Sequence, residues 1–167
     1  MKNVKIIGLT LVAFILISCN NTSGNKPKKI IDTDNEKVAA SKKIKPEYLT
    51  YETFKQKVWN FEKNPQVWIY EGELPCVIDF YADWCKPCRM IAPIMIELAK
   101  KYEGKVLIYK IDTQKEKELA KIFQIRSIPA VLFSPLKGKP MMQAGALPKD
   151  MYIKIIEENL LNPVEIK

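Results

Sequence analysis

Residues 77–93 read VIDFYADWCKPCRMIAP, and this stretch decides the fold. An apolar run, Val77 to Tyr81, precedes two cysteines three residues apart, and an amphipathic stretch from Met90 to Tyr102 follows them. The pattern predicts a buried strand, a short loop and a helix. Cys85 would lie at the helix N-terminus, where unpaired backbone N–H groups and the helix dipole favour an anion. We therefore expect Cys85 to be a thiolate nucleophile and Cys88, on the first helical turn, to resolve a mixed disulfide.

The same cysteine spacing also occurs in half of a zinc site. Zinc needs four ligands, usually Cys and His, and the chain has no His and no second pair of this spacing. Copper(I) on two thiolates is a further alternative, which nothing else in the chain supports. We therefore favour a redox-active disulfide between Cys85 and Cys88, with no metal and no other cofactor.

Three segments resemble the thioredoxin family. Residues 77–93 are similar to its active-site strand and helix almost position for position, residues 126–129 (RSIP) to its cis-proline segment, and residues 145–147 (GAL) to the glycine that closes its substrate groove. The resemblance covers about Tyr48 to Leu161. It implies an α/β protein with the thioredoxin fold, a central mixed sheet of about five strands with helices on both faces.

Local patterns predict the same architecture. Strands are expected at Tyr48–Leu49, Cys76–Tyr81, Lys105–Ile111, Pro129–Phe133 and Pro140–Ala144. Helices are expected after a Thr50 N-cap and at Cys88–Tyr102, Lys115–Phe123 and Met151–Leu161.

The chain departs from the family pattern at three places. Lys86 stands where thioredoxins usually carry Gly, and Tyr81 where bacterial ones usually carry Trp. The segment before the active-site strand, residues 60–75, is longer and rich in aromatic residues. No role is predicted for this segment.

Asp79 is an acid within an apolar strand. Burial of a carboxylate is costly and raises its pKa. The resemblance implies that Asp79 lies under the dithiol and exchanges a proton with Cys88, which must become a thiolate to attack. Lys110, on the neighbouring strand, matches the lysine that the family places near this acid.

The resemblance also implies a groove that binds a peptide beside Cys85. A peptide would pair with the backbone at Ile128 like an added strand, and the groove would select main chain more than side chains. Its residues would be Trp84, Pro87, Ile128, Pro129, Gly145 and Ala146. Trp84 stands in the loop before the helix, and this position favours a surface lid over a core residue.

The N-terminus predicts export. Residues 1–18 contain a 12-residue apolar run, too short to span a membrane but suited to a signal peptide. Residues 16–19 (LISC) resemble the bacterial lipobox, in which cleavage precedes a Cys that becomes lipidated. The alternative is a plain secretory signal with an incidental Cys. We expect lipidated Cys19 to anchor the chain to a membrane, residues 19–47 to form a flexible tether, and residues 48–167 to form the thioredoxin domain.

The net charge of +8 does not indicate nucleic-acid binding. Two of the 27 basic residues lie in the leader, and seven lie in residues 20–47. Residues 20–47 also hold four of the 19 acidic residues. Eighteen basic and 15 acidic residues remain from Tyr48 onward, an ordinary balance. We expect a monomer that acts on disulfide-containing envelope proteins and draws electrons from a membrane donor.

Cys76 is a further cysteine, at the start of the active-site strand and nine residues before Cys85. A small buried apolar residue is the favoured interpretation, and a regulatory or intermolecular thiol is the alternative.

Together these features favour a thiol–disulfide reductase of the cell envelope. The first alternative is a disulfide oxidase or isomerase. Envelope oxidases of this superfamily carry a helical domain between the helix of the cysteines and the cis-proline, whereas here Cys88 and Pro129 are only 41 positions apart. The second alternative is a non-enzymatic lipoprotein that binds a metal or a partner.

Overall fold

A computed structural model describes residues 44–162 of the chain. Its strands are β1 (Glu47–Tyr48), β2 (Cys76–Tyr81), β3 (Leu107–Asp112), β4 (Ala130–Ser134) and β5 (Met141–Ala144). Its helices are α1 (Tyr51–Lys57), α2 (Lys86–Lys101), α3 (Lys117–Ile122) and α4 (Lys149–Ile155), followed by the π-helical turn η1 (Ile156–Leu161). The expected signal peptide, Cys19 and most of the tether lie outside the described residues.

The strands form one mixed sheet in the order β1-β3-β2-β4-β5. β2 is at its centre, parallel to β3 and antiparallel to β4, and every residue of β2 is buried. β1 runs parallel to β3 at one edge and β5 antiparallel to β4 at the other. The predicted five-stranded mixed sheet is confirmed.

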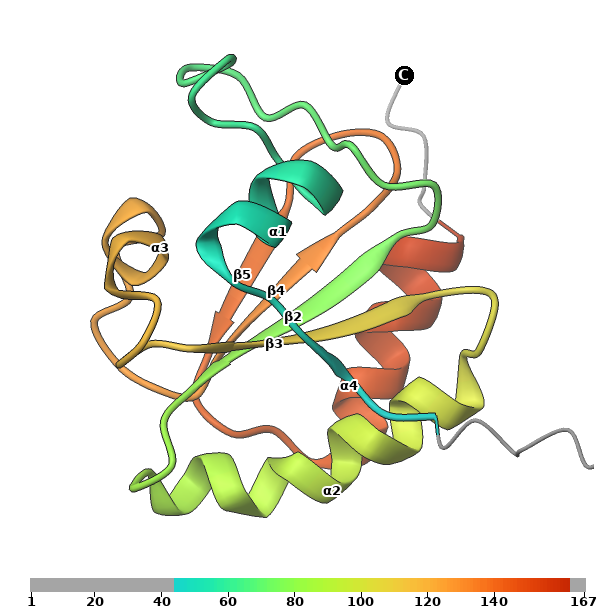
Figure 1. Cartoon of the computed structure of the whole chain (residues 1–167). Coiled ribbons are helices and arrows are strands. Elements are labelled where there is room, and N and C mark those ends of the chain that lie inside the picture. The colour runs from blue at the N-terminus through green and yellow to red at the C-terminus, as the bar shows by residue number, and fades with distance from the viewer. Residues whose placement is uncertain (1–43, 163–167) are drawn as a thin grey trace, which may run out of the picture. The chain divides into compact units, whose positions relative to one another are not determined.

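Helices cover both faces of this sheet, α1 and α3 on one and α2 and α4 on the other (Figure 1). The side chains of β2 contribute to the cores on both faces of the sheet, because successive side chains of a strand point to opposite faces. Val77 packs with the core under α2 and α4, whereas Ile78 and Phe80 pack with the core under α1 and α3. Asp79 and Tyr81 share the phase of Val77 and so point toward the layer of α2.

Three helix starts differ from the predicted ones. α3 begins at Lys117, two residues after the predicted Lys115. α2 begins at Lys86, two residues before the predicted start, because Cys85 is its N-cap and Pro87 lies in its first turn. Proline suits that position, since its missing N–H would have no partner there. α4 begins at Lys149 rather than Met151, directly after Pro148.

Residues 60–75 extend the apolar core on the face of α1 and α3. The rings of Trp59 and Trp68 lie 5.0 Å apart, and both contact Phe123, which follows α3. The indole N–H of Trp59 donates to the carbonyl of Val67 at 3.0 Å. The aromatic residues around this segment therefore serve packing, on the sheet face away from α2.

Within residues 44–162, no helix is both long and apolar enough to cross a membrane.

Candidate active site

The two cysteines form a disulfide at the N-terminus of α2. Their sulfur atoms are 2.07 Å apart and their Cα atoms 5.3 Å apart. Both are nearly buried, Cys85 at 3% and Cys88 at 2% exposure. The backbone N–H of Cys88 points at Sγ of Cys85 over 3.2 Å. After reduction the same N–H would stabilise a Cys85 thiolate, because hydrogen bonds to a charged acceptor favour the charged form.

Local hydrogen bonds fix the loop that carries Cys85. Its N–H donates to the carbonyl of Ala82 at 3.1 Å, and its own carbonyl accepts from the N–H of Arg89 at 3.2 Å. The Arg89 side chain reaches back to the carbonyl of Asp83 at 3.0 Å. The turn before α2 is thus held at both ends, which keeps Cys85 in the capping position.

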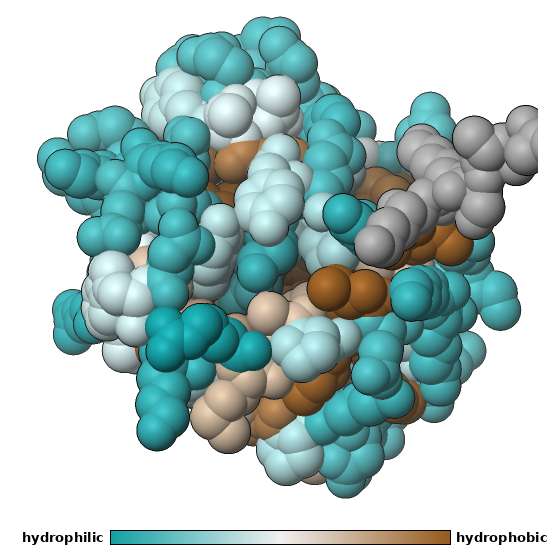
Figure 2. Space-filling model, turned by 60° about the horizontal axis from the view of Figure 1, so that its bottom comes forward, coloured by the Kyte–Doolittle hydropathy of each residue, from teal (hydrophilic) through white to brown (hydrophobic). Residues whose placement is uncertain are grey.

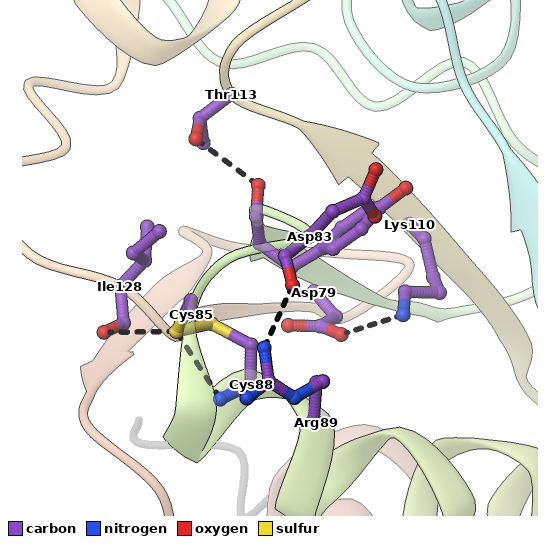
Figure 3. The surroundings of a disulfide bond; sticks show 9 residues. Asp79, Asp83, Cys85, Cys88, Arg89, Lys110, Thr113 and Ile128 are labelled. Carbon is purple, nitrogen blue, oxygen red and sulfur yellow. Dashed lines mark hydrogen bonds and ion pairs between the residues drawn. A yellow bond between two sulfur atoms is a disulfide. The ribbon is translucent and has the colours of Figure 1, made fainter.

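Asp79 is fully buried in β2, on the sheet face toward α2. In Figure 3 its carboxylate lies between the disulfide and the amine of Lys110. Neither carboxylate oxygen accepts a hydrogen bond within the described part of the chain. Burial raises the pKa of Asp79 to about 6, and Lys110 partly opposes this rise. The carboxyl group can therefore gain and lose a proton near neutral pH.

Lys110 lies directly opposite Asp79 in the register of β2 and β3. Its Nζ is 3.5 Å from Oδ2 of Asp79, an ion pair without hydrogen-bond geometry. The same Nζ sits 4.0 Å from the centre of the Tyr81 ring, within the range of a cation–π contact. The amine thus has a carboxylate and an aromatic face as partners.

The Ile128–Pro129 peptide bond is cis, as the family resemblance implied. The carbonyl oxygen of Ile128 is 3.7 Å from Sγ of Cys85, and the carbonyl of Pro129 accepts from the N–H of Gly145 at 2.8 Å. Gly145 has φ of +86°, a conformation that residues with a Cβ rarely adopt. The glycine therefore lets the chain after β5 turn against the proline segment.

A hollow of about 540 Å³ opens beside Cys85. It is lined by Trp84, Cys85, Lys86, Pro87, Thr113, Ala120, Ile125, Arg126, Ser127 and Ile128. Trp84 is 66% exposed at its rim, which agrees with a surface position. The face on the α2 side comes forward in Figure 2, where apolar residues are gathered within a hydrophilic surface.

The structure gathers most of the expected site residues, but not all of them in this hollow. Trp84, Pro87 and Ile128 line it, whereas Pro129, Gly145 and Ala146 do not. Pro129 is buried and hydrogen-bonded to Gly145, and Ala146 is exposed. The hollow therefore includes three of the six residues expected to line the groove.

Several residues that lie at the site were not predicted from the sequence. Thr113 donates from both its N–H and its hydroxyl to the carbonyl of Tyr81, at 2.9 and 3.0 Å, and so joins the ends of β3 and β2. Arg126 and Ser127 belong to the segment compared with the cis-proline motif, which was the available signal for them. No pattern in the sequence pointed to Thr113.

Cys76 lies at the other end of β2 from the disulfide and is fully buried. Burial raises the pKa of its thiol to about 12, so the thiol stays protonated and unreactive. This environment supports the packing interpretation of Cys76.

The geometry supports one kind of chemistry, the reversible exchange of a disulfide. The cysteine pair at the N-terminus of α2 borders the hollow, where a substrate could bind. The buried Asp79 carboxyl group lies on the other side of the pair. Within residues 44–162, no three His, Cys, Asp or Glu side chains gather as metal ligands.

Comparison with known proteins gives the same result. The family model named Thioredoxin matches residues 45–158. The chain is 43% identical to the thioredoxin of Borreliella burgdorferi over 110 residues, which cover 66% of this chain and 93% of that protein. It is 36% identical to thioredoxin 1 of Nostoc sp. over 112 residues, 67% of this chain and 94% of that protein.

Among solved structures, chloroplastic thioredoxin z superposes with a TM-score of 0.56 at 22% identity, over 68% of this chain and 93% of that one. This likeness supports the fold alone. The family match and the similar thioredoxins go further and show a protein-disulfide oxidoreductase. The chain belongs to the thioredoxin family.

Proposed function

We propose that this chain is a membrane-tethered reductase of protein disulfides in the bacterial cell envelope. The observation that carries the chemistry is the buried Asp79 carboxyl on the sheet face toward the cysteine pair. A group that accepts a proton there makes a thiolate from Cys88, and that thiolate releases the reduced substrate.

The reaction has two steps. The Cys85 thiolate attacks one sulfur of a substrate disulfide, and the other substrate sulfur leaves as a thiolate that takes up a proton. Cys88 then gives its proton to Asp79 and attacks Sγ of Cys85, which breaks the mixed disulfide and releases the second substrate sulfur as a thiolate that takes up a proton. The substrate gains two electrons as two thiols, and the Cys85–Cys88 pair loses two electrons as it closes.

The short connection between α2 and Pro129 supports the reducing direction. It forms only β3, α3 and their loops. The oxidases of this superfamily that act in the envelope insert a helical domain at this point. A reductase in a compartment that favours disulfides needs a membrane donor of electrons, and lipidated Cys19 would keep the domain near such a donor.

Lys86 favours the second candidate, a disulfide oxidase. It is exposed beside Cys85 at the start of α2. A cation there stabilises the thiolate, and a more stable reduced form makes a dithiol more oxidising. Exposure to water and salt keeps this effect small.

The thiol state in cells tests the proposal. Cells that express the full chain are quenched in acid, and the denatured protein is alkylated with a maleimide that adds mass. With the Cys19 thiol blocked by its lipid, the reduced form takes three tags, on Cys76, Cys85 and Cys88, and the oxidised form takes one, on Cys76. A reductase is expected mainly with three tags in the membrane fraction.

The variant Cys85→Ser/Cys88→Ser is the control and must show one tag under all conditions. A wild type that carries mainly one tag in cells would contradict the reductase and favour the oxidase.

A further inference from the structure

Tyr81 occupies a position that the proposed chemistry does not use. It ends β2, two residues after Asp79, so both side chains lie on the sheet face toward α2. Its side chain is only 9% exposed, and its carbonyl accepts both hydrogen bonds from Thr113. The residue is therefore fixed by its backbone as well as by its neighbours.

The ring of Tyr81 contacts Lys110 on one side and Tyr48 on another. Lys110 Nζ is 4.0 Å from the ring centre, and the ring of Tyr48 in β1 meets it edge to face with centres 6.2 Å apart. In the parallel register Lys110 faces Asp79 on β2 and Tyr48 on β1. The three strands thus place one amine among a carboxylate and an aromatic pair.

Within the described residues, this contact with the ring is closer than the other amine–ring contacts. Lys55 lies 4.8 Å from the ring centre of Tyr51, and Lys101 lies 5.2 Å from that of Tyr102. The Lys110 side chain is also only 10% exposed, so its amine is poorly solvated by water. A cation–π contact gains strength when the cation is desolvated.

We propose that Tyr81 is a positioning residue whose ring holds the Lys110 ammonium beside Asp79 and thereby sets the pH at which Asp79 takes a proton. Within residues 44–162 no donor forms a hydrogen bond with Asp79, so the charge of Lys110 is the main influence that favours its ionised form. Without the ring, the long lysine side chain would gain freedom to turn toward water. The carboxyl group would then keep its burial and lose its counter-charge.

Other titratable groups near this cluster do not replace Lys110. The charges of Tyr48, Asp112 and Asp83 raise the pKa of Tyr81. The charge of Asp79 raises the pKa of Tyr152 in α4. Burial raises the pKa of Tyr81 to about 12 and raises that of Tyr152, so both phenols are neutral at working pH.

Cys88 approaches from α2, and Asp112 is paired with Lys115 at 3.2 Å. Lys110 is therefore the cation paired with Asp79 within the described residues.

The proposal rests on proton transfer between Cys88 and Asp79, but its test does not. The side-chain carboxyl of Asp79 is titrated by NMR in the reduced full chain labelled with ¹³C-aspartate, and the signal is assigned by its loss in Asp79→Asn. The wild type is compared with Tyr81→Phe, Tyr81→Leu and Lys110→Met. An opposite charge at this range lowers a carboxyl pKa by about one to three units, so its loss gives a rise of that size.

We expect Tyr81→Phe to titrate as the wild type does, because the ring face is kept. Tyr81→Leu is expected to move the midpoint upward by about one pH unit, in the direction of Lys110→Met. In the Lys110→Met background, Tyr81→Leu is expected to add no further shift. The control Tyr51→Leu removes a tyrosine that contacts a lysine far from the site and is expected to leave the midpoint unchanged.

Two results would overturn the inference. The first is a Tyr81→Leu midpoint equal to that of the wild type. The second is an equal upward shift in the Lys110→Met background, which would assign the effect to packing around Asp79 and not to Lys110. A separate pH profile of substrate reduction in Asp79→Asn tests the proton transfer itself, so the two claims fail independently.

Discussion

Asp79 is the residue at which stability and function conflict most. Its carboxyl group is fully buried in the central strand and accepts no hydrogen bond from residues 44–162, so it destabilises the fold whenever it is ionised. Its one charged partner within the described residues, Lys110, stands at ion-pair distance without hydrogen-bond geometry. A pKa of about 6 is the consequence of this incomplete compensation, and it is the value that suits a proton acceptor near neutral pH.

The pH dependence of stability tests this view of Asp79. The pKa is 3.8 in the unfolded chain and about 6 in the folded one. Between these values the folded chain holds a proton that the unfolded chain has lost, so stability falls as the pH rises through this window. Above it, ionised Asp79 costs about 3 kcal/mol, from about two units at 1.36 kcal/mol each.

Urea unfolding of the oxidised wild type and of Asp79→Asn at pH 4, 6 and 8 measures this cost. All other titrations are shared, so the stability of Asp79→Asn relative to the wild type is expected to grow by about 2.5 kcal/mol from pH 4 to pH 8. A difference that stays constant over this range would show that Asp79 does not titrate there.

The residues of this site illustrate what sequence can reveal. Asp79 was recognisable as an acid within an apolar strand, and its burial followed from its neighbours. The contact of Tyr81 with Lys110 was not recognisable, because it depends on which strands are adjacent and in which register. Tyr81 appeared in the sequence only as a departure from the family pattern.

At the scale of elements, the N-terminus of α2 distinguishes the two cysteines. Cys85 is the N-cap and receives the N–H of Cys88 on its sulfur, whereas Cys88 lies within the helix. The strand–loop–helix pattern of residues 77–93 made this asymmetry predictable. The exact start of α2 was not, because Pro87 is compatible with either side of a helix boundary.

The asymmetry predicts which cysteine attacks. In Cys88→Ser the second step is blocked, so mixed disulfides between Cys85 and substrate proteins are expected to accumulate. They are counted by non-reducing electrophoresis after an acid quench, with Cys85→Ser as the matched control. Trapping of substrates through Cys88 in Cys85→Ser would reverse the assignment.

The segment 60–75 shows the limit of prediction at this scale. Its aromatic residues were evident in the sequence, but their use required the tertiary structure. Trp59 and Trp68 pair with each other and with Phe123 on the sheet face away from α2, so they extend a core rather than the groove.

At the scale of the whole molecule, the chain belongs to the thioredoxin family, and the proposed setting depends on the residues before the described part. Lipidation of Cys19 would place a domain of this kind on a membrane without a spanning helix. Labelled fatty acid is therefore expected in the full chain and not in Cys19→Ala, as measured by radiolabelling and immunoprecipitation. Equal labelling of both would contradict the anchor.

The reduction potential of the Cys85–Cys88 couple tests the central claim most directly. The full chain is equilibrated against a series of glutathione or dithiothreitol ratios, and the fraction of dithiol is measured by alkylation. Reducing thioredoxins lie at about −270 mV, so a reductase of this type is expected below about −200 mV, where about 30 mV corresponds to a tenfold change in equilibrium constant. A value near −120 mV, roughly that of a strong disulfide oxidase, would contradict the account and reverse the direction of electron flow.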